Sequence, residues 1–290
     1  MPHHKSPATE NLILLSDRGL LAITGADARP FLQGMTTCNI AKLTEVQALY
    51  GAHLTPQGRM VAPFFVYNYQ GKILLDCAKD HLMPLAKTLH GYKMRFQIDF
   101  EDLSDDFALF ADLTPAAAPL GTCAFLENGL QIADPRLAAM GSRYLLPPAP
   151  LAAANTVGAY HAHRIALCMP ESTDFLPQKT IAGEFCLEYQ SGVDYKKGCY
   201  IGQEMTARTY FRSPPKRRVI ALKYAGPAPA FGAELSAGNL KIGHVFSCAN
   251  GYGIAIARVE KAFDAPLTSG GLTMTAEKPQ WADYAVESTG

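Results

Sequence analysis

Short apolar runs, separated by glycine, proline and polar residues, fill the first half of the chain. Alternating or compact apolar runs bounded by turn residues predict strands, and these are residues 12–15, 20–24, 61–69, 72–77 and 93–100. Helical patterns are predicted at 27–34, at 81–91 and from 151 to just before Pro170. Strand pairs joined by short turns and followed by a helix indicate an α+β fold with antiparallel sheets, not a doubly wound parallel sheet.

The pattern changes after Pro214-Pro215. Only strand and turn signals follow, with strands predicted at residues 218–224, 240–247 and 253–259. Glycine and proline punctuate these strands at short intervals, as is typical of a small antiparallel barrel or sandwich. We therefore place a domain boundary near Pro214, which separates a first region (1–214) from a C-terminal antiparallel β-barrel (215–290).

Composition narrows the possible binding partners. The chain has 290 residues, 48% of them hydrophobic, which is enough for a buried core and suggests about two domains. Its 26 Lys and Arg balance 26 Asp and Glu, so the formal net charge is zero. A general binder of nucleic acid or of anionic membranes needs a basic excess. We therefore expect neither direct nucleic-acid binding nor membrane association.

The cysteines and histidines do not form a recognisable ligand set. Seven cysteines are present, and none forms a Cys-x-x-Cys pair, which argues against a disulfide framework and a zinc or iron–sulfur site. His161 and His163 fall in a predicted helix, where a spacing of two places them on different faces, so no metal site is predicted. With no secretory signal or membrane-length apolar run in view, a reducing cytoplasm is the expected location.

One cysteine stands out by its neighbours. Cys199 lies between Gly198 and Gly202, behind two lysines, and a helix-forming run begins at Gln203. A helix that starts there points free N–H groups and the positive end of its dipole back toward the thiol. The pKa of such a thiol is expected to fall below that of a free cysteine. The alternative, from the residues alone, is a buried cysteine that serves as a small hydrophobe.

The segment around Cys199 resembles a known signature. Residues 197–204, Lys-Gly-Cys-Tyr-Ile-Gly-Gln-Glu, are similar at every position to the signature of the YgfZ-type folate-binding proteins, and residues 24–34 resemble the opening segment of that family. The motif residues are Lys197, Gly198, Cys199, Tyr200, Gly202, Gln203 and Glu204. The resemblance covers nearly the whole chain. It implies two interleaved α+β subdomains, the second spanning residues 48–103, and a C-terminal β-barrel around a central folate-sized channel.

The YgfZ-type proteins are iron–sulfur cluster assembly factors related to the glycine-cleavage T-protein, an aminomethyltransferase. The resemblance therefore implies a tetrahydrofolate-binding accessory factor that supports assembly or repair of iron–sulfur enzymes, including enzymes that modify transfer RNA. The implied partners are folate and iron–sulfur enzymes or assembly proteins. Cys199 would be the essential residue, and its role stays open among a nucleophile, a redox thiol and a transient metal or cluster ligand.

Four residues match folate contacts of these relatives. Tyr67 falls where T-proteins place a tyrosine against the folate, and its ring could stack on a pterin, although an ordinary strand tyrosine is the alternative. Glu184 matches a glutamate that reads the pterin edge, since a carboxylate accepts paired hydrogen bonds; otherwise it is a solvated charge. Arg208 and Arg212 are candidates to bind the carboxylates of the glutamate tail.

A departure from the T-protein pattern limits the expected chemistry. T-proteins place acidic residues of a Gly-x-x-x-Asp-Asp stretch against the reacting folate nitrogen, whereas here Ala62 and Pro63 follow Gly58 at the acidic positions. Neither can accept a proton, and losing such a group costs orders of magnitude in rate. We therefore do not expect a turnover aminomethyltransferase. A folate-dependent one-carbon transferase with altered acid–base chemistry and a protein-interaction scaffold without folate turnover are the alternatives.

Overall fold

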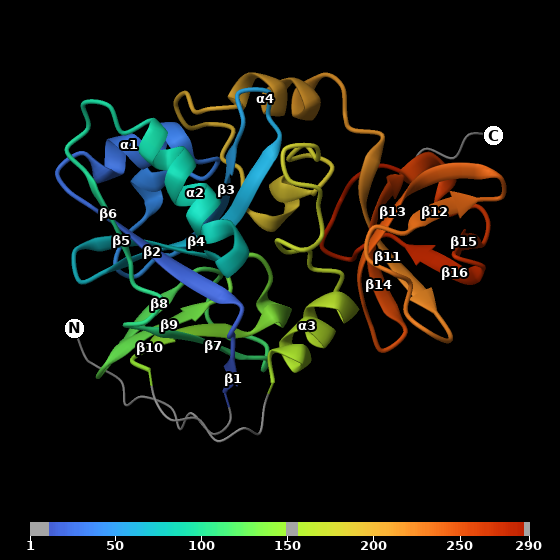
Figure 1. Cartoon of the computed structure of the whole chain (residues 1–290), viewed down its shortest axis with the longest axis horizontal. Coiled ribbons are helices and arrows are strands. Elements are labelled where there is room, and N and C mark those ends of the chain that lie inside the picture. Colours follow the sequence, from blue (N-terminus) through green and yellow to red (C-terminus); the bar gives the residue numbers. More distant parts are fainter. Residues whose placement is uncertain (1–11, 149–155, 287–290) are drawn as a thin grey trace.

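A computed structural model of the chain describes residues 12–148 and 156–286 (Figure 1). Within these residues, two five-stranded sheets precede a closed barrel of six strands. All paired strands run antiparallel. The predicted α+β class with antiparallel sheets and a C-terminal β-barrel is therefore confirmed.

The first sheet has the strand order β3-β4-β5-β2-β6. Its strands are β2 (Arg18–Thr24), β3 (Leu49–Leu54), β4 (Met60–Tyr69), β5 (Lys72–Ala78) and β6 (Asp99–Asp102). Strand β6 is shorter than the predicted 93–100 because residues 93–97 form a turn region in which Met94 has a positive φ of 38°.

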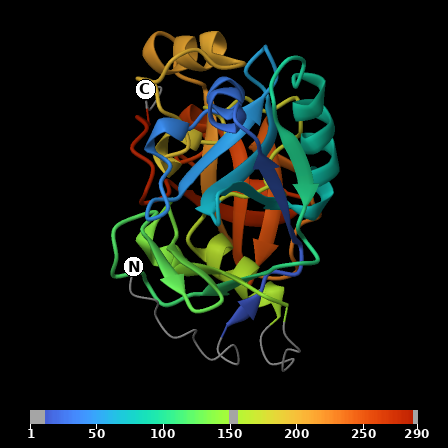
Figure 2. The same ribbon diagram turned by 90° about the vertical axis from the view of Figure 1, so that its left-hand side faces the viewer.

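Alternation along β4 explains why this sheet is buried on both faces. Ala62, Phe64 and Val66 point to the side covered by α1 (Ala28–Met35) and α2 (Lys79–Gly91), whereas Phe65 and Tyr67 point to the opposite side. Helix α2 is seen along the edge of this layer in Figure 2. The hydrophobic residues on the two faces belong to two separate clusters, as expected for a central layer.

The second sheet has the order β1-β7-β10-β9-β8. Its strands are β1 (Ile13–Leu14), β7 (Ala108–Asp112), β8 (Cys123–Leu126), β9 (Gly129–Ala133) and β10 (Ser142–Leu146). Strand β1 pairs with β7, so the chain leaves this sheet, builds the first sheet and returns. Helix α3 (Val157–Ala166) follows it, and the predicted start of that helix at 151–154 lies outside the described residues.

Helix α4 (Gln203–Phe211) leads into the barrel. The barrel strands are β11 (Arg217–Tyr224), β12 (Glu234–Ala237), β13 (Leu240–Ala249), β14 (Tyr252–Arg258), β15 (Leu267–Ser269) and β16 (Leu272–Glu277). Short 3₁₀ turns are η2 (Ile40–Lys42), η3 (Ala138–Met140), η4 (Leu187–Gln190) and η5 (Val259–Lys261). Among the described helices, none combines the length and the apolar character needed to cross a membrane.

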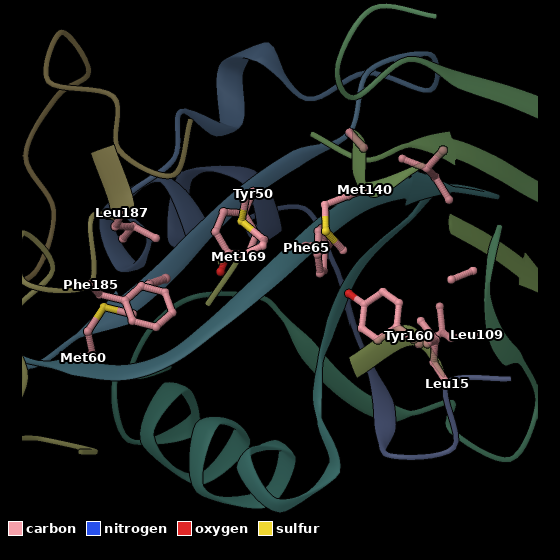
Figure 3. Close-up of a cluster of buried hydrophobic side chains, with 14 of the residues drawn as sticks. Leu15, Tyr50, Met60, Phe65, Leu109, Met140, Tyr160, Met169, Phe185 and Leu187 are labelled. Atoms are coloured by element: carbon pink, nitrogen blue, oxygen red, sulfur yellow. The ribbon is translucent and has the colours of Figure 1, made fainter. Parts of the chain in front are cut away.

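The largest hydrophobic cluster lies where the two sheets face each other. Phe65 of β4 and Leu109 of β7 both belong to it, and Met169, Phe185 and Leu187 extend it toward the later segments of the chain (Figure 3). The cluster is close-packed and largely inaccessible to solvent. It therefore holds segments from before and after the first sheet in a single core.

Charged side chains cross the middle of this core. The guanidinium of Arg18 pairs with Asp76 at 2.6 Å and with Glu171 at 3.3 Å, and the guanidinium of Arg143 pairs with Asp76 at 2.6 Å. Arg136 binds Glu171 at 2.9 Å and also Asp134. Three buried cations thus meet three buried carboxylates. We call these six residues the buried charge network: Arg18, Asp76, Asp134, Arg136, Arg143 and Glu171.

The buried charge network makes stability depend on pH. Burial by itself would raise the pKa of Glu171, but Arg136 and Arg18 hold that pKa well below its usual range. A carboxyl group whose pKa is depressed by folding stabilises the protein above its unfolded pKa, and this contribution is lost as the pH falls. We therefore expect the free energy of unfolding to decrease progressively below about pH 4.5.

Replacing Glu171 by Gln should remove this contribution. The Glu171→Gln change leaves buried guanidinium charge uncompensated, so a loss of about 3–5 kcal/mol in unfolding free energy is expected from urea titration at neutral pH. Glu127→Gln, at an exposed carboxylate, is the control and should change stability little. Equal stability of the two variants would show that the network does not support the fold.

Candidate functional site

The Cys199 loop, residues 194–202, connects η4 with α4 and is attached to the segment after α1. The amide of Asp194 donates a hydrogen bond to the carbonyl of Thr37 at 3.0 Å. The amide of Ile201 donates one to the carbonyl of Gly34, in the last turn of α1, also at 3.0 Å. The carboxylate of Asp194 accepts hydrogen bonds from Asn39 and from the amide of Lys196. The two segments that carry the sequence resemblance, 24–34 and 197–204, therefore lie together.

Gly202 fixes the point where the loop becomes a helix. Its φ is +82°, and a Cβ atom there would lie 2.7 Å from the carbonyl oxygen of Thr55 and 3.1 Å from the Cα of Gly58. A side chain is therefore excluded by both conformation and space. The tip of the β3–β4 hairpin thus sits directly against the start of α4, and Met205 touches it at Gly58.

Cys199 is the one exposed cysteine among the seven, all of which the structure describes. Cys248 is partly exposed, and the other five are buried. Burial raises the pKa of Cys77, Cys123 and Cys186 to about 12, so these thiols are poor nucleophiles at neutral pH. The alternative reading of Cys199 as a buried small hydrophobe is wrong.

Lys197 attaches the Cys199 loop to the end of α1. Its ammonium group is buried and donates to the backbone carbonyls of Thr36 at 2.6 Å and Cys38 at 2.7 Å. It also lies 5.0 Å from the centre of the Tyr200 ring. Burial lowers the pKa of Lys197 to about 8. The lysine thus ties the Cys199 loop to the end of α1 and is not a free surface charge.

Of the remaining motif residues, some hold the loop in place and others are exposed to solvent. The side-chain oxygen of Gln203 accepts a hydrogen bond from the amide of Tyr200, which closes the loop onto the first turn of α4. Gly198 has open space around it, and Glu204 is exposed. The motif therefore combines residues that hold the loop in place with others that surround an accessible thiol.

Tyr67 lies in the centre of the molecule, away from Cys199. Its hydroxyl donates to Asp76 at 2.8 Å and accepts from the Nε of Arg143 at 3.1 Å, and the residue is fully buried. The nearby cavity that Pro63 lines with members of the buried charge network is too small for a water molecule. In this conformation the centre has no space for a folate ring against Tyr67.

The other three predicted folate contacts lie at the Cys199 end. Glu184 is half-buried, and its carboxylate accepts a hydrogen bond from the amide of Ile181, which pairs with Arg59 at the hairpin tip. Burial raises the pKa of Glu184. Arg208 and Arg212 are exposed, one helical turn apart, at the end of α4. These residues offer groups that suit the polar ends of a folate.

Tyr67 does not form one site with these residues. Tyr67 of β4 lies eight positions after Arg59, a span of roughly 26 Å at about 3.3 Å per residue. The structure therefore brings Glu184 close to Arg59 and places Tyr67 far along the strand.

Sequence reasoning missed the buried charge network. Asp76 lies among apolar residues from Ile73 to Ala78 of β5 and faces the same cluster as Leu74, so its charge needs a buried partner. That pattern is a usable signal for a partner, but it does not say which arginine supplies it. Arg218 was also missed: it is buried, and it pairs with Glu188 of η4 and so joins the barrel to the preceding region.

Comparison with known proteins supplies the family. A model of the CAF17 C-terminal beta-barrel domain matches residues 216–284. The iron-sulfur cluster assembly factor IBA57 of Mus musculus, a mitochondrial protein, is 33% identical over 245 residues, which cover 76% of this chain and 68% of that protein. The chain belongs to the IBA57 family. The Mycosarcoma maydis IBA57 homolog is 31% identical over 78% of this chain but only 60% of its own length.

The chain spans 60% and 56% of the IBA57 homologs of Mycosarcoma maydis and Neurospora crassa. The fold has a structural relative in the glycine cleavage system aminomethyltransferase T of Bartonella henselae, with a TM-score of 0.74 at 15% identity over 94% of this chain and 86% of that one. This likeness shows that the IBA57-family chain has an aminomethyltransferase-like fold.

The expected cytoplasmic location is wrong. The IBA57 relatives from Mycosarcoma maydis, Neurospora crassa, Mus musculus and Homo sapiens are all named as mitochondrial proteins. The expectation rested on unpaired cysteines and on the lack of a recognisable secretory signal or membrane-length apolar run, and unpaired cysteines indicate only a reducing environment. They do not identify the compartment that provides it.

Thiol accessibility can be measured directly. We expect iodoacetamide to modify one thiol rapidly in the folded protein, and peptide mass spectrometry to place it at Cys199, because the other cysteines are buried or partly buried. Cys199→Ser should abolish the fast phase, and the control Cys248→Ser should retain it. A fast phase that maps to Cys248 would contradict the assigned exposure.

Proposed function

We propose that this chain is an iron–sulfur cluster assembly factor of the YgfZ type that acts through Cys199. Membership in the IBA57 family supports the cluster-assembly role. The observation that carries the assignment to Cys199 is its exposure on a loop that Lys197 and Gly202 hold in a fixed position. Its clients would be iron–sulfur enzymes, including enzymes that modify transfer RNA.

The thiol could serve as a nucleophile, a redox group or a transient ligand of a metal or cluster. One cysteine cannot hold an iron–sulfur cluster alone, because such clusters are usually bound by four protein ligands. Among the described residues, no group of three or more His, Cys, Asp or Glu side chains is placed to hold a metal ion. As a cluster ligand, Cys199 would need further ligands from a partner protein or from a second copy of the chain. Each of the three roles depends on the same accessible sulfur.

Tetrahydrofolate is the proposed small-molecule ligand. The aminomethyltransferase-like fold supports this proposal. Glu184 would meet the pterin edge, and Arg208 and Arg212 would bind the carboxylates of the glutamate tail. These residues and Cys199 belong to elements that adjoin the hairpin tip. Stacking on Tyr67 stays a prediction that requires the buried charge network to open.

The role of Cys199 is tested in a strain that lacks the native gene. Expression of the Cys199→Ser variant should leave iron–sulfur enzyme activities at the level of the deletion strain, because serine cannot supply a thiolate. Folding should be unchanged, since the side chain is exposed, and a thermal melt checks this. Cys248→Ser should restore activity as the wild-type chain does. Full rescue by Cys199→Ser would refute the proposed function.

Folate binding is tested separately by anaerobic calorimetric titration with tetrahydrofolate. We expect micromolar affinity for the wild-type chain and a loss of about tenfold or more for Glu184→Ala, which removes a paired acceptor. Glu127→Ala, at an exposed carboxylate elsewhere, is the control and should bind normally. Absence of binding at millimolar folate would remove the ligand and favour the scaffold alternative without affecting the test of Cys199.

A further inference from the structure

Helix α4 buries little of its own surface. Thr206 is its one buried residue, and large apolar side chains are left exposed to solvent. The exposed fractions are 37% for Met205, 45% for Tyr210 and 66% for Phe211. Surface helices usually bury an apolar stripe against the core, and apolar side chains that gather on a surface mark sites of interaction. Figure 1 shows α4 at the upper edge of the molecule.

The aromatic side chains of α4 form one wall of a groove. The rings of Tyr195 and Tyr210 stack with centroids 3.9 Å apart, and Phe211 meets Tyr195 edge-on at 5.6 Å. Beside them is a cavity of about 610 Å³ that Leu49 and Val193 also line. We call this feature the α4 groove, and these five residues define it. The other lining residues are polar or charged or a cysteine: Cys38, Asn39, Lys42, Ser191, Asp194 and Lys196. The apolar part of the groove fits an apolar side chain of a partner.

Lys42 and Lys196 line the α4 groove, and two arginines lie on or just after α4. Lys196, Arg208 and Arg212 are exposed and form no ion pair with the residues that the structure describes. Lys42 lines the groove too, and its ammonium group neutralises Asp194 at 2.7 Å. Glu204 is the one acidic residue of α4. The chain as a whole is neutral, so this local excess of cations is a property of this face.

We propose that the α4 groove is the docking surface for an acidic iron–sulfur protein, which places an apolar side chain in the groove and a carboxylate on Lys196. The inference rests on the proposed function, because the docked protein is the one on which Cys199 acts. Cys199 lies four residues after Tyr195, on the same loop that leads into α4, and is exposed. A protein seated in the groove is thus brought to the thiol.

A nucleic acid matches the α4 groove less well than a protein does. Tyr195 and Tyr210 already stack on each other, whereas single-stranded nucleic acids need free aromatic faces for their bases. The aliphatic residues Leu49 and Val193 have no counterpart in base recognition and are typical of protein interfaces. Charge complementarity then selects an acidic protein surface over a neutral one.

The first experiment measures client activity in the deletion strain. Phe211→Ser and Lys196→Glu should each lower iron–sulfur enzyme activity about tenfold or more, as expected for central contacts of an interface. The matched controls are Phe231→Ser, at a barrel phenylalanine that is 63% exposed, and Lys87→Glu, at an exposed lysine of α2. Both controls should retain activity.

The outcomes separate the two proposals. Full activity of Phe211→Ser and Lys196→Glu, together with loss in Cys199→Ser, overturns docking at the α4 groove and leaves the proposed function intact. Full activity of Cys199→Ser overturns the proposed function and the docking inference with it. A folding defect is recognised because tetrahydrofolate titration and thermal melts of the purified variants would then change as well.

The second experiment identifies the occupant. A photo-crosslinking amino acid is placed at position 211 or, as a control, at 231 in the full chain. The proposal requires that an acidic iron–sulfur protein crosslinks at 211 and not at 231. The purified partner should also bind more weakly at high salt and to Lys196→Glu. The proposal would be overturned by crosslinks at 211 to RNA or to a second copy of the chain. It would also be overturned if crosslinking were equal at 211 and 231, or if nothing crosslinked at 211.

Discussion

Three guanidinium groups packed around one phenylalanine ring constrain the whole molecule. The carbon atoms at the centres of the Arg143, Arg136 and Arg18 guanidiniums lie 3.9, 4.6 and 5.3 Å from the centroid of Phe65. These cations are withdrawn from water, so each requires a carboxylate, and those carboxylates come from β5, the segment after β9 and the segment after α3. Shifting either sheet would separate charges that cannot be solvated. The buried charge network therefore fixes the two sheets relative to each other.

The centre of the molecule is filled by buried side chains, and the exposed thiol of Cys199 lies at the periphery. The chain shares its fold with an aminomethyltransferase, but Tyr67 at its centre is engaged by Asp76 and Arg143. The exposed thiol lies instead on a loop fixed by backbone carbonyls at the end of α1 and by the hairpin tip. A fixed loop holds a reactive group in one position, which costs less entropy when a partner arrives.

Periodicity and local chemistry predicted what depends on neighbours in sequence. The antiparallel strands, the barrel after Pro214 and the helix after Gly202 all follow from alternation, turn residues and capping. Long-range partners do not follow. Lys197 reads as a surface charge until Thr36 and Cys38 are found beside it, about 160 positions earlier. Asp76, within an apolar stretch of β5, signals a missing cation, yet that Arg18 and Arg143 supply it depends on how β2 and the second sheet lie against β5.

Long-range contacts at its two ends explain why α4 can remain exposed. The Zimm–Bragg nucleation cost makes a nine-residue helix marginal in isolation, so attachments at its two ends must hold it. Its first residue follows Gly202, which the hairpin tip contacts, and its end is held by the stacking of Tyr210 on Tyr195. These attachments leave Arg208 exposed, and Phe211, which meets Tyr195 edge-on, is still 66% exposed. Few packing contacts therefore constrain the residues on the exposed face of α4. The identity of these residues can instead reflect recognition of a partner beside Cys199.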